Sequence, residues 1–238
     1  MNDATSSLLT DAADPSLKSR QKLVLKALDY AYEAAIEGVG PFESAKKLAD
    51  YYSKRLETKD KAVQSLIRMQ IAKASTSGFV TGLGGIITIP VTLPANVVSV
   101  ALIQVRMATA IAYLYGFDPR EDRVKTLVYL TLCGSAAGET IKTILKETGV
   151  KISLGLLRKV PGSLILAINR QIGFRLITKF GATGTINLSK AIPIVSGAVC
   201  ATFDGVTTRM IGMYAVQFFS TPDVDTTPLE NLPSTGSN

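Results

Sequence analysis

Three charged side chains lie inside otherwise apolar blocks of the sequence. Arg106 directly follows the uncharged stretch 74–105, and Asp204 and Arg209 lie within the apolar block 188–219. A buried charge is costly unless it is paired, and loss of one partner of a buried pair costs about 3–5 kcal/mol. These residues therefore predict either an internal ion pair or a polar site within an apolar cavity.

The two interpretations give the same residues different roles. In the first, Asp204 pairs with Arg106, because Asp204 and Arg209 point in directions about 140° apart on a helix. In the second, Arg106 or Arg209 holds an anionic group such as a lipid headgroup, and nearby polar side chains supply hydrogen bonds. The candidates for this supporting role are Asn96, Gln104, Thr207 and Thr208.

Catalytic and metal-binding patterns are absent from the sequence. The chain has no His, and its two cysteines, Cys133 and Cys200, lie in separate apolar blocks, as expected in a reducing cytoplasm. His is the commonest general base and metal ligand, and two lone thiols cannot form a zinc cluster. The sequence predicts no metal site, cofactor or catalytic residue. A hydrolase-like enzyme that uses Asp204 and the buried arginines is the third-ranked alternative.

Basic residues are concentrated in one segment. The chain has 26 Lys and Arg against 19 Asp and Glu, a net charge of +7, and residues 142–190 contain nine basic residues and one acidic residue. A local positive excess attracts polyanions, either anionic lipid or nucleic acid. We expect anionic membrane lipid rather than nucleic acid. The candidate docking residues are Lys142, Lys146, Lys151, Arg158, Lys159, Arg170, Arg175 and Lys179.

The stretch 74–105 is the element around which the rest of the chain is arranged. It is long enough for a bilayer span, which needs about 20 apolar residues. Several glycines interrupt it, and Pro90 and Pro94 follow them. Proline in a helix interior removes a donor and clashes with the preceding turn. We therefore expect two apolar helical pieces joined by a Gly/Pro elbow, either as a core hairpin or partly embedded in lipid.

Helical periodicity extends over most of the remaining chain. Apolar residues at helical spacing predict helices at 16–38, at 43–57 and from 60 onward. Further helices are expected at 95–115, from 119 to about 137, at 163–180 and within 188–219, and Gly116 should end one of them. No segment shows sustained period-two alternation. The sequence predicts an all-α fold, a compact multi-helix domain built around two Gly/Pro-broken apolar helical units.

The two apolar units resemble each other weakly. Ile89-Pro90 and Arg106-Met107 recur as Ile192-Pro193 and Arg209-Met210, both displaced by 103 residues, so an internal repeat is one interpretation. Small residues four apart, such as Gly134 and Gly138, predict faces for close helix packing. We expect a disordered N-terminus at 1–15, one helical domain at 16–220 and a disordered polar tail at 221–238.

Four blocks in order resemble the EcsC family of bacterial proteins. They read GFVTGLGGIITIPVTLPANV, QVRMATAIAYLYGFDPREDRV, INRQIGFRLITKFGATGTINLSKAIPIVSGAV and FDGVTTRMIGMYAV, and they lie within about 50–219. The sequence departs from the family at Ser196-Gly197, where Gly-Gly is usual. The resemblance implies a cytoplasmic or membrane-associated bacterial protein, and it carries no agreed reaction or catalytic residue.

The leading hypothesis is a membrane-associated helical protein on the cytoplasmic side. It would dock on anionic lipid through residues 142–190, with an apolar core that binds lipid or inserts shallowly. We expect it to be cytoplasmic, peripheral to or partly embedded in the cytoplasmic membrane. The alternative is a soluble helical interaction or regulatory module with wholly internal apolar units and a protein partner. The sequence does not determine an oligomeric state.

Overall fold

The computed structural model describes residues 26, 28–40, 42–75, 95–134, 165 and 193–220, of which 95–99 and 193–203 are described by their backbone alone. Residues 28–37 are helical. The other helices are α3 (Ala45–Arg55), α4 (Lys59–Ser75), α6 (Ala95–Leu114), α7 (Asp122–Leu132) and α10 (Pro193–Ser220). The described residues contain no strand, only an isolated bridge between Val39 and Phe42. The predicted all-α fold is confirmed.

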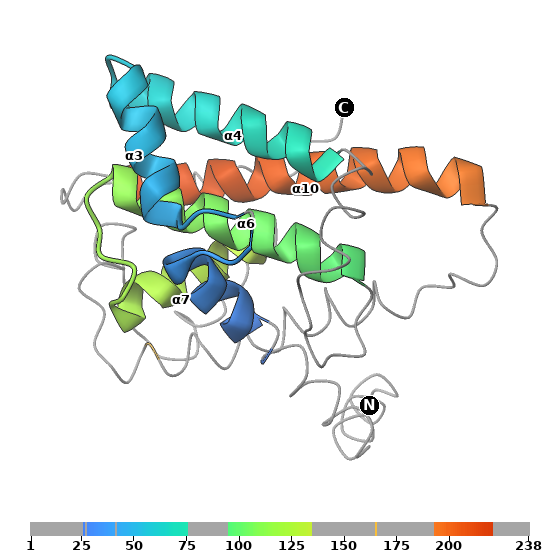
Figure 1. Ribbon diagram of the computed structural model, residues 1–238, viewed down its shortest axis with the longest axis horizontal. Coiled ribbons are helices and arrows are strands. Elements are labelled where there is room, and N and C mark those ends of the chain that lie inside the picture. Colours follow the sequence, from blue (N-terminus) through green and yellow to red (C-terminus); the bar gives the residue numbers. More distant parts are fainter. Residues whose placement is uncertain are drawn as a thin grey trace, which may run out of the picture.

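Helix α6 lies at the centre of the bundle, in contact with α3, α4, α7 and α10 (Figure 1). Every side chain from 101 to 112 is buried. Its sequence explains this position, because Arg106 is its only charged residue and a helix that is apolar on all sides has to be covered on all sides. The apolar piece expected at 95–115 is thus the core helix.

Contacts between side chains define how α4 and α10 lie against the core. A Cβ on Gly212 would meet Ile67, and one on Gly205 would meet Ile71 and Ser75, so α4 and α10 are antiparallel. Gln104 contacts Thr207, and the ring of Phe117, just after α6, lies 5.2 Å from that of Phe219. Helices α6 and α10 therefore run parallel and in register, as Figure 1 shows, but the described residues show no repeat.

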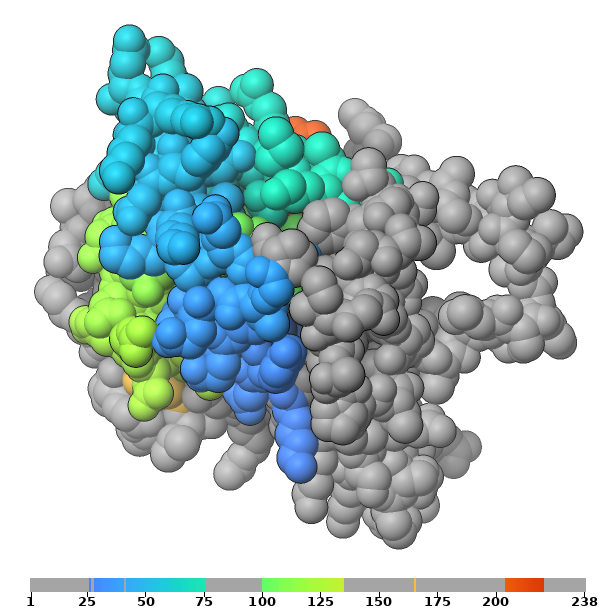
Figure 2. Space-filling model, in the orientation of Figure 1, coloured from blue at the N-terminus to red at the C-terminus, as the bar shows by residue number. Residues whose placement is uncertain are grey.

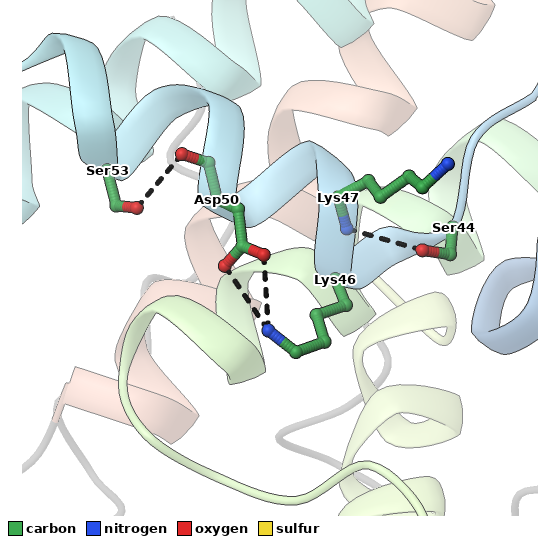
Figure 3. Close-up of polar contacts among 5 residues, drawn as sticks. All are labelled: Ser44, Lys46, Lys47, Asp50 and Ser53. Carbon is green, nitrogen blue, oxygen red and sulfur yellow. Dashed lines mark hydrogen bonds and ion pairs between the residues drawn. The ribbon is translucent and has the colours of Figure 1, made fainter.

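Helix α3 begins at a well-formed N-cap. The Ser44 hydroxyl accepts a hydrogen bond from the backbone N–H of Lys47 at 3.3 Å, and one turn further Lys46 pairs with Asp50 at 3.1 Å (Figure 3). Capping by Ser satisfies a donor that would otherwise be free at the first turn. A basic last turn, which includes Arg55, also complements the helix dipole. These local signals agree with the predicted helix at 43–57.

The sequence predictions for two glycines at helix ends, Gly116 and Gly134, had different outcomes. Gly116 has φ of +86° just after α6, so the predicted glycine end of this helix is confirmed. The helix expected to reach about 137 instead ends at Leu132, because Gly134 adopts φ of +58°. Gly134 donates to the carbonyl of Thr131 in this closing turn. It therefore lies outside the helix, and its predicted role in a helical packing face is wrong.

Several predicted elements lie outside the described residues. These are the elbow at 76–94, most of the helix at 163–180, and the termini at 1–15 and 221–238. In the ranges that are described, no helix has both the length and the apolar character needed to cross a bilayer.

Candidate functional site

The three embedded charges are not gathered at one place. Arg106 on α6 is 4% exposed, Asp204 on α10 is half-buried, and Arg209 on α10 is exposed. None of the ion pairs between described residues includes any of them. The predicted Asp204–Arg106 pair is therefore not formed, because Arg106 faces α3 whereas α10 lies on another side of α6.

Gln104 occupies the side of α6 that faces α10. Its Nε2 donates to the hydroxyls of Thr208 at 3.1 Å and Thr207 at 3.3 Å. Gln104 and Arg106 are two positions apart on a helix, so their side chains point about 160° apart. The polar residues predicted to support an arginine thus bind one another instead. The side chain of Asn96, the remaining candidate for this supporting role, is not among the described ones.

Arg106 lies in a partly aromatic environment beneath α3. Its guanidinium carbon is 5.6 Å from the ring centroid of Phe42. Burial lowers the pKa of Arg106, whereas the charges of Glu43 and Tyr52 act to raise it. The Nε of Arg106 is buried and has no hydrogen-bond partner among the described residues. Within that part of the chain, one donor of the guanidinium is therefore left without an acceptor.

A second cation lies close to Arg106. Burial lowers the pKa of Lys73, near the end of α4, and the positive charge of Arg106 lowers it further. The charge of Glu43 opposes both effects, but Glu43 is exposed. The exposed Glu43 carboxylate therefore offsets the two positive charges only in part, because water screens it.

Two further buried residues have polar atoms without partners in the described part of the chain. Gln70 is fully buried on α4, and neither its Oε1 nor its Nε2 has a hydrogen-bond partner there. The Oγ1 of Thr109, one turn after Arg106 on α6, has none either. Ile67 and Ile71 fix the register of α4 against α10, and α6 is in register with α10, so Gln70 lies about level with Gln104. The Oε1 of Gln104 also has no hydrogen-bond partner among the described residues.

Helix α3 packs on the side of α6 that carries Arg106, and α3 and residues 28–40 form much of the visible face in Figure 2. Sequence reasoning selected Arg106 but did not select Gln70, Lys73 or Thr109. The available signal was Gln70, which takes a position in the buried stripe of α4 that Val63, Leu66 and Ala74 also occupy.

The outer face of α10 has an unusual composition for an exposed surface. Val206 is 53% and Met213 is 47% exposed, and Arg209 lies between them on the same face. Burial raises the pKa of Asp204, the other charged residue of this helix. We call Val206, Arg209 and Met213 the α10 face. The basic candidates from Lys142 to Lys179 lie outside the described residues.

Taken together, the fold and the site define an all-α domain whose central helix carries a buried, incompletely satisfied cation. Comparison with protein families gives a match to the EcsC protein family over residues 2–221, and the chain belongs to this family. The match also covers residues 2–49, which precede the part of the chain that carries the sequence resemblance. No curated protein and no solved structure matches the chain.

Proposed function

We propose that the chain is a membrane-associated helical protein that docks on anionic lipid from the cytoplasmic side. The observation that carries the proposal is the α10 face, which presents Val206 and Met213 to solvent with Arg209 between them. A helix at the surface of a globular protein normally turns charged and polar residues outward. An outward face of apolar side chains with a cation is instead typical of a helix that lies at a membrane interface.

The charge of the chain favours a membrane over other partners of this face. The net charge is +7, and residues 142–190 alone hold nine basic residues against one acidic residue. A basic residue close to an anionic leaflet contributes roughly 1 kcal/mol. Four or five such residues facing lipid are therefore enough for reversible docking, with the α10 face adding apolar burial.

Cosedimentation with lipid vesicles tests this proposal. We expect the protein to bind vesicles that contain phosphatidylglycerol and to remain in solution with phosphatidylcholine alone. Binding should weaken as salt rises, because the Debye length falls from about 10 Å at 0.1 M to about 3 Å at 1 M. Equal binding to both kinds of vesicle, or binding to neither, would refute anionic docking.

Two sets of matched variants show which part of the protein contacts the vesicle surface. Lys151→Gln, Arg158→Gln and Lys159→Gln together should abolish binding, whereas the same number of charges removed from α3 should not. The control triple is Lys47→Gln, Lys54→Gln and Arg55→Gln, all exposed on that helix.

The apolar contribution of the α10 face to vesicle binding is tested by comparing the binding of Met213→Gln with that of Met69→Gln. The two methionines are similarly exposed, at 47% and 49%, but Met69 lies on the side of α4 that points away from α10. Only Met213→Gln should weaken vesicle binding. If both variants bind vesicles like the unchanged protein and Met213→Gln instead disrupts a protein complex, the α10 face serves a protein partner.

A further inference from the structure

We infer that the first half of α10, residues 193–208, separates from α4 and α6 and inserts shallowly into an anionic membrane, while residues 211–219 stay packed in the bundle. The inference rests on the proposed docking function and names the element that enters the lipid. Figure 1 shows α10 continuing past the ends of α4 and α6, so these two helices line only part of its length.

The register of α4 against α10 defines where α10 leaves its packing surface. A Cβ on Gly205 would lie 3.8 Å from the Cβ of Ser75, which is the last residue of α4. Because the two helices are antiparallel, residues 193–204 of α10 extend beyond this end of α4. An opening of α10 from α4 therefore has to break contacts only from Gly205 onward.

The buried residues of α10 differ between its two halves. The ring of Phe219 packs 5.2 Å from that of Phe117, and the core side chains of this half are all at most 3% exposed, namely Ile211, Tyr214, Ala215, Phe218 and Phe219. In the other half, the contacts with α4 and α6 run through Gly205, Thr207 and Thr208. These residues bury little apolar surface. Apolar burial therefore holds residues 211–219 more firmly than residues 204–208.

A polar layer lies at the less firmly held half. It consists of Gln70, Gln104, Thr207 and Thr208, which the register of α4, α6 and α10 places at about one level. The Nε2 of Gln104 donates to both hydroxyls, but its Oε1 and both amide atoms of Gln70 have no partner among the described residues. Buried polar groups without partners lose the hydrogen bonds that water would provide. Opening would return these groups to water, so the polar layer lowers the free energy that opening requires.

The composition of residues 193–208 suits a lipid interface. Residues 193–203 contain no charged residue, and Asp204 is the only one in this half of α10. Asp204 is half-buried and takes part in none of the ion pairs between described residues. A carboxylate is costly inside the hydrocarbon of a bilayer, whereas an apolar helix lies readily at its boundary with the headgroups. Insertion is therefore shallow, with Asp204 at the level of the headgroups.

Hydrogen exchange of the free protein tests the opening without lipid. The backbone amides of residues 205–209 should exchange at least about tenfold faster than those of residues 214–219, because a helix segment that leaves its packing surface is only marginally stable in water. Fraying of the helix end alone would give the opposite order, since α10 ends at Ser220. Equal exchange of the two groups, or faster exchange of residues 214–219, would overturn the inference.

Gln70→Leu should hold the first half of α10 closed, because it replaces two buried polar atoms by an apolar side chain. Exchange of residues 205–209 should slow about fivefold, and binding to phosphatidylglycerol vesicles should weaken. The matched control, Gln64→Leu on the exposed side of α4, should leave both unchanged. Faster exchange in Gln70→Leu would mean that the amide stabilises the closed state, against the inference.

A disulfide across the opening tests whether α10 has to open for full membrane binding. The separation of 3.8 Å between the Cβ positions of residues 75 and 205 is typical of disulfides. Ser75→Cys with Gly205→Cys should therefore lock this half of α10 against α4 when oxidised. The oxidised protein should bind phosphatidylglycerol vesicles at least about fivefold more weakly than the reduced protein, because it cannot add the apolar burial of the opened helix.

A second disulfide serves as the matched control. Ile67→Cys with Gly212→Cys joins the same two helices at a contact that stays closed, so oxidation of this pair should not change vesicle binding. Cys133→Ala and Cys200→Ala in all of these proteins leave only the introduced thiols.

The vesicle results distinguish this inference from the proposed function. If the protein locked at residues 75 and 205 binds phosphatidylglycerol vesicles as well as its reduced form, docking stands and the inference is wrong. If no form binds these vesicles, the proposed function is refuted and insertion of α10 with it, whereas hydrogen exchange still decides whether α10 opens.

Discussion

Gly212→Ala tests the close packing of α4 against α10. A Cβ at this position would lie 3.0 Å from the Cγ1 of Ile67 and 3.1 Å from both its Cδ1 and its Cγ2. All three distances are shorter than ordinary van der Waals contact. Ile67 cannot rotate away easily, because a β-branched side chain in a helix has one strongly preferred χ1 rotamer. The two helices would have to separate slightly.

The expected change in the free energy of unfolding for Gly212→Ala is the difference between two opposing effects. Alanine is favoured over glycine in a helix interior by about 1 kcal/mol. Overpacking a well-filled interface costs about 1–3 kcal/mol. Gly212→Ala should therefore lower the free energy of unfolding by about 1 kcal/mol, a decrease of about 2–4 °C in Tm for a chain of this size.

Urea unfolding followed by circular dichroism measures this change, and a second substitution isolates its cause. Ile67→Val removes the Cδ1 atom and should cost about 0.5–1.5 kcal/mol in the unchanged protein. Combined with Gly212→Ala, it should cost less, because it removes one of the three close atoms of Ile67. An increase in stability of about 1 kcal/mol for Gly212→Ala alone would show that the glycine is not a packing residue, and would refute the reasoning.

Two further predictions concern the buried polar residues of α10. Thr208→Val removes the nearer acceptor of the Gln104 amide, 3.1 Å away, and should cost about 1–3 kcal/mol in a urea titration, whereas Thr208→Ser should cost less because it keeps the hydroxyl. Burial raises the pKa of Asp204 in the folded protein above its unfolded value of about 3.9. The protonated carboxyl therefore stabilises the fold below about pH 3.9, and this stabilisation is lost as the pH rises through the folded pKa. Asp204→Asn should therefore stabilise the protein at pH 7 and have little effect below about pH 4, and a loss of stability at pH 7 would indicate a partner for the carboxylate.

Helix positions were predictable wherever the signals were local. The helices expected at 43–57 and 95–115 are α3 and α6, with ends that differ by at most two residues. Ser44 and Gly116 mark those ends through a side-chain cap and a positive φ, which depend only on neighbouring residues. Gly134 misled the prediction because glycine serves both as a helix-packing residue and as a helix-ending residue.

The neighbours of each side chain of α6 could not be predicted in the same way. An amphipathic helix such as α3 indicates its buried face through its periodicity, but α6 is apolar on every side and indicates none. Gln104 and Arg106 were grouped because they are close in sequence, whereas they point to α10 and to α3. Only the arrangement of the surrounding helices separates them.

The in-register packing of α10 on α6 and α4 has a consequence for the order in which the protein folds. More than a hundred residues separate α10 from α4, so their contacts close a long loop and are expected to form slowly. During synthesis α3, α4 and α6 leave the ribosome first and can assemble from local contacts. Until α10 arrives, Ile67, Ile71 and the Gln104 amide remain open to water. The final step of folding is thus the docking of α10, which has only two charged residues, onto the exposed apolar surfaces of α4 and α6. Before this step the nascent chain is most prone to aggregation.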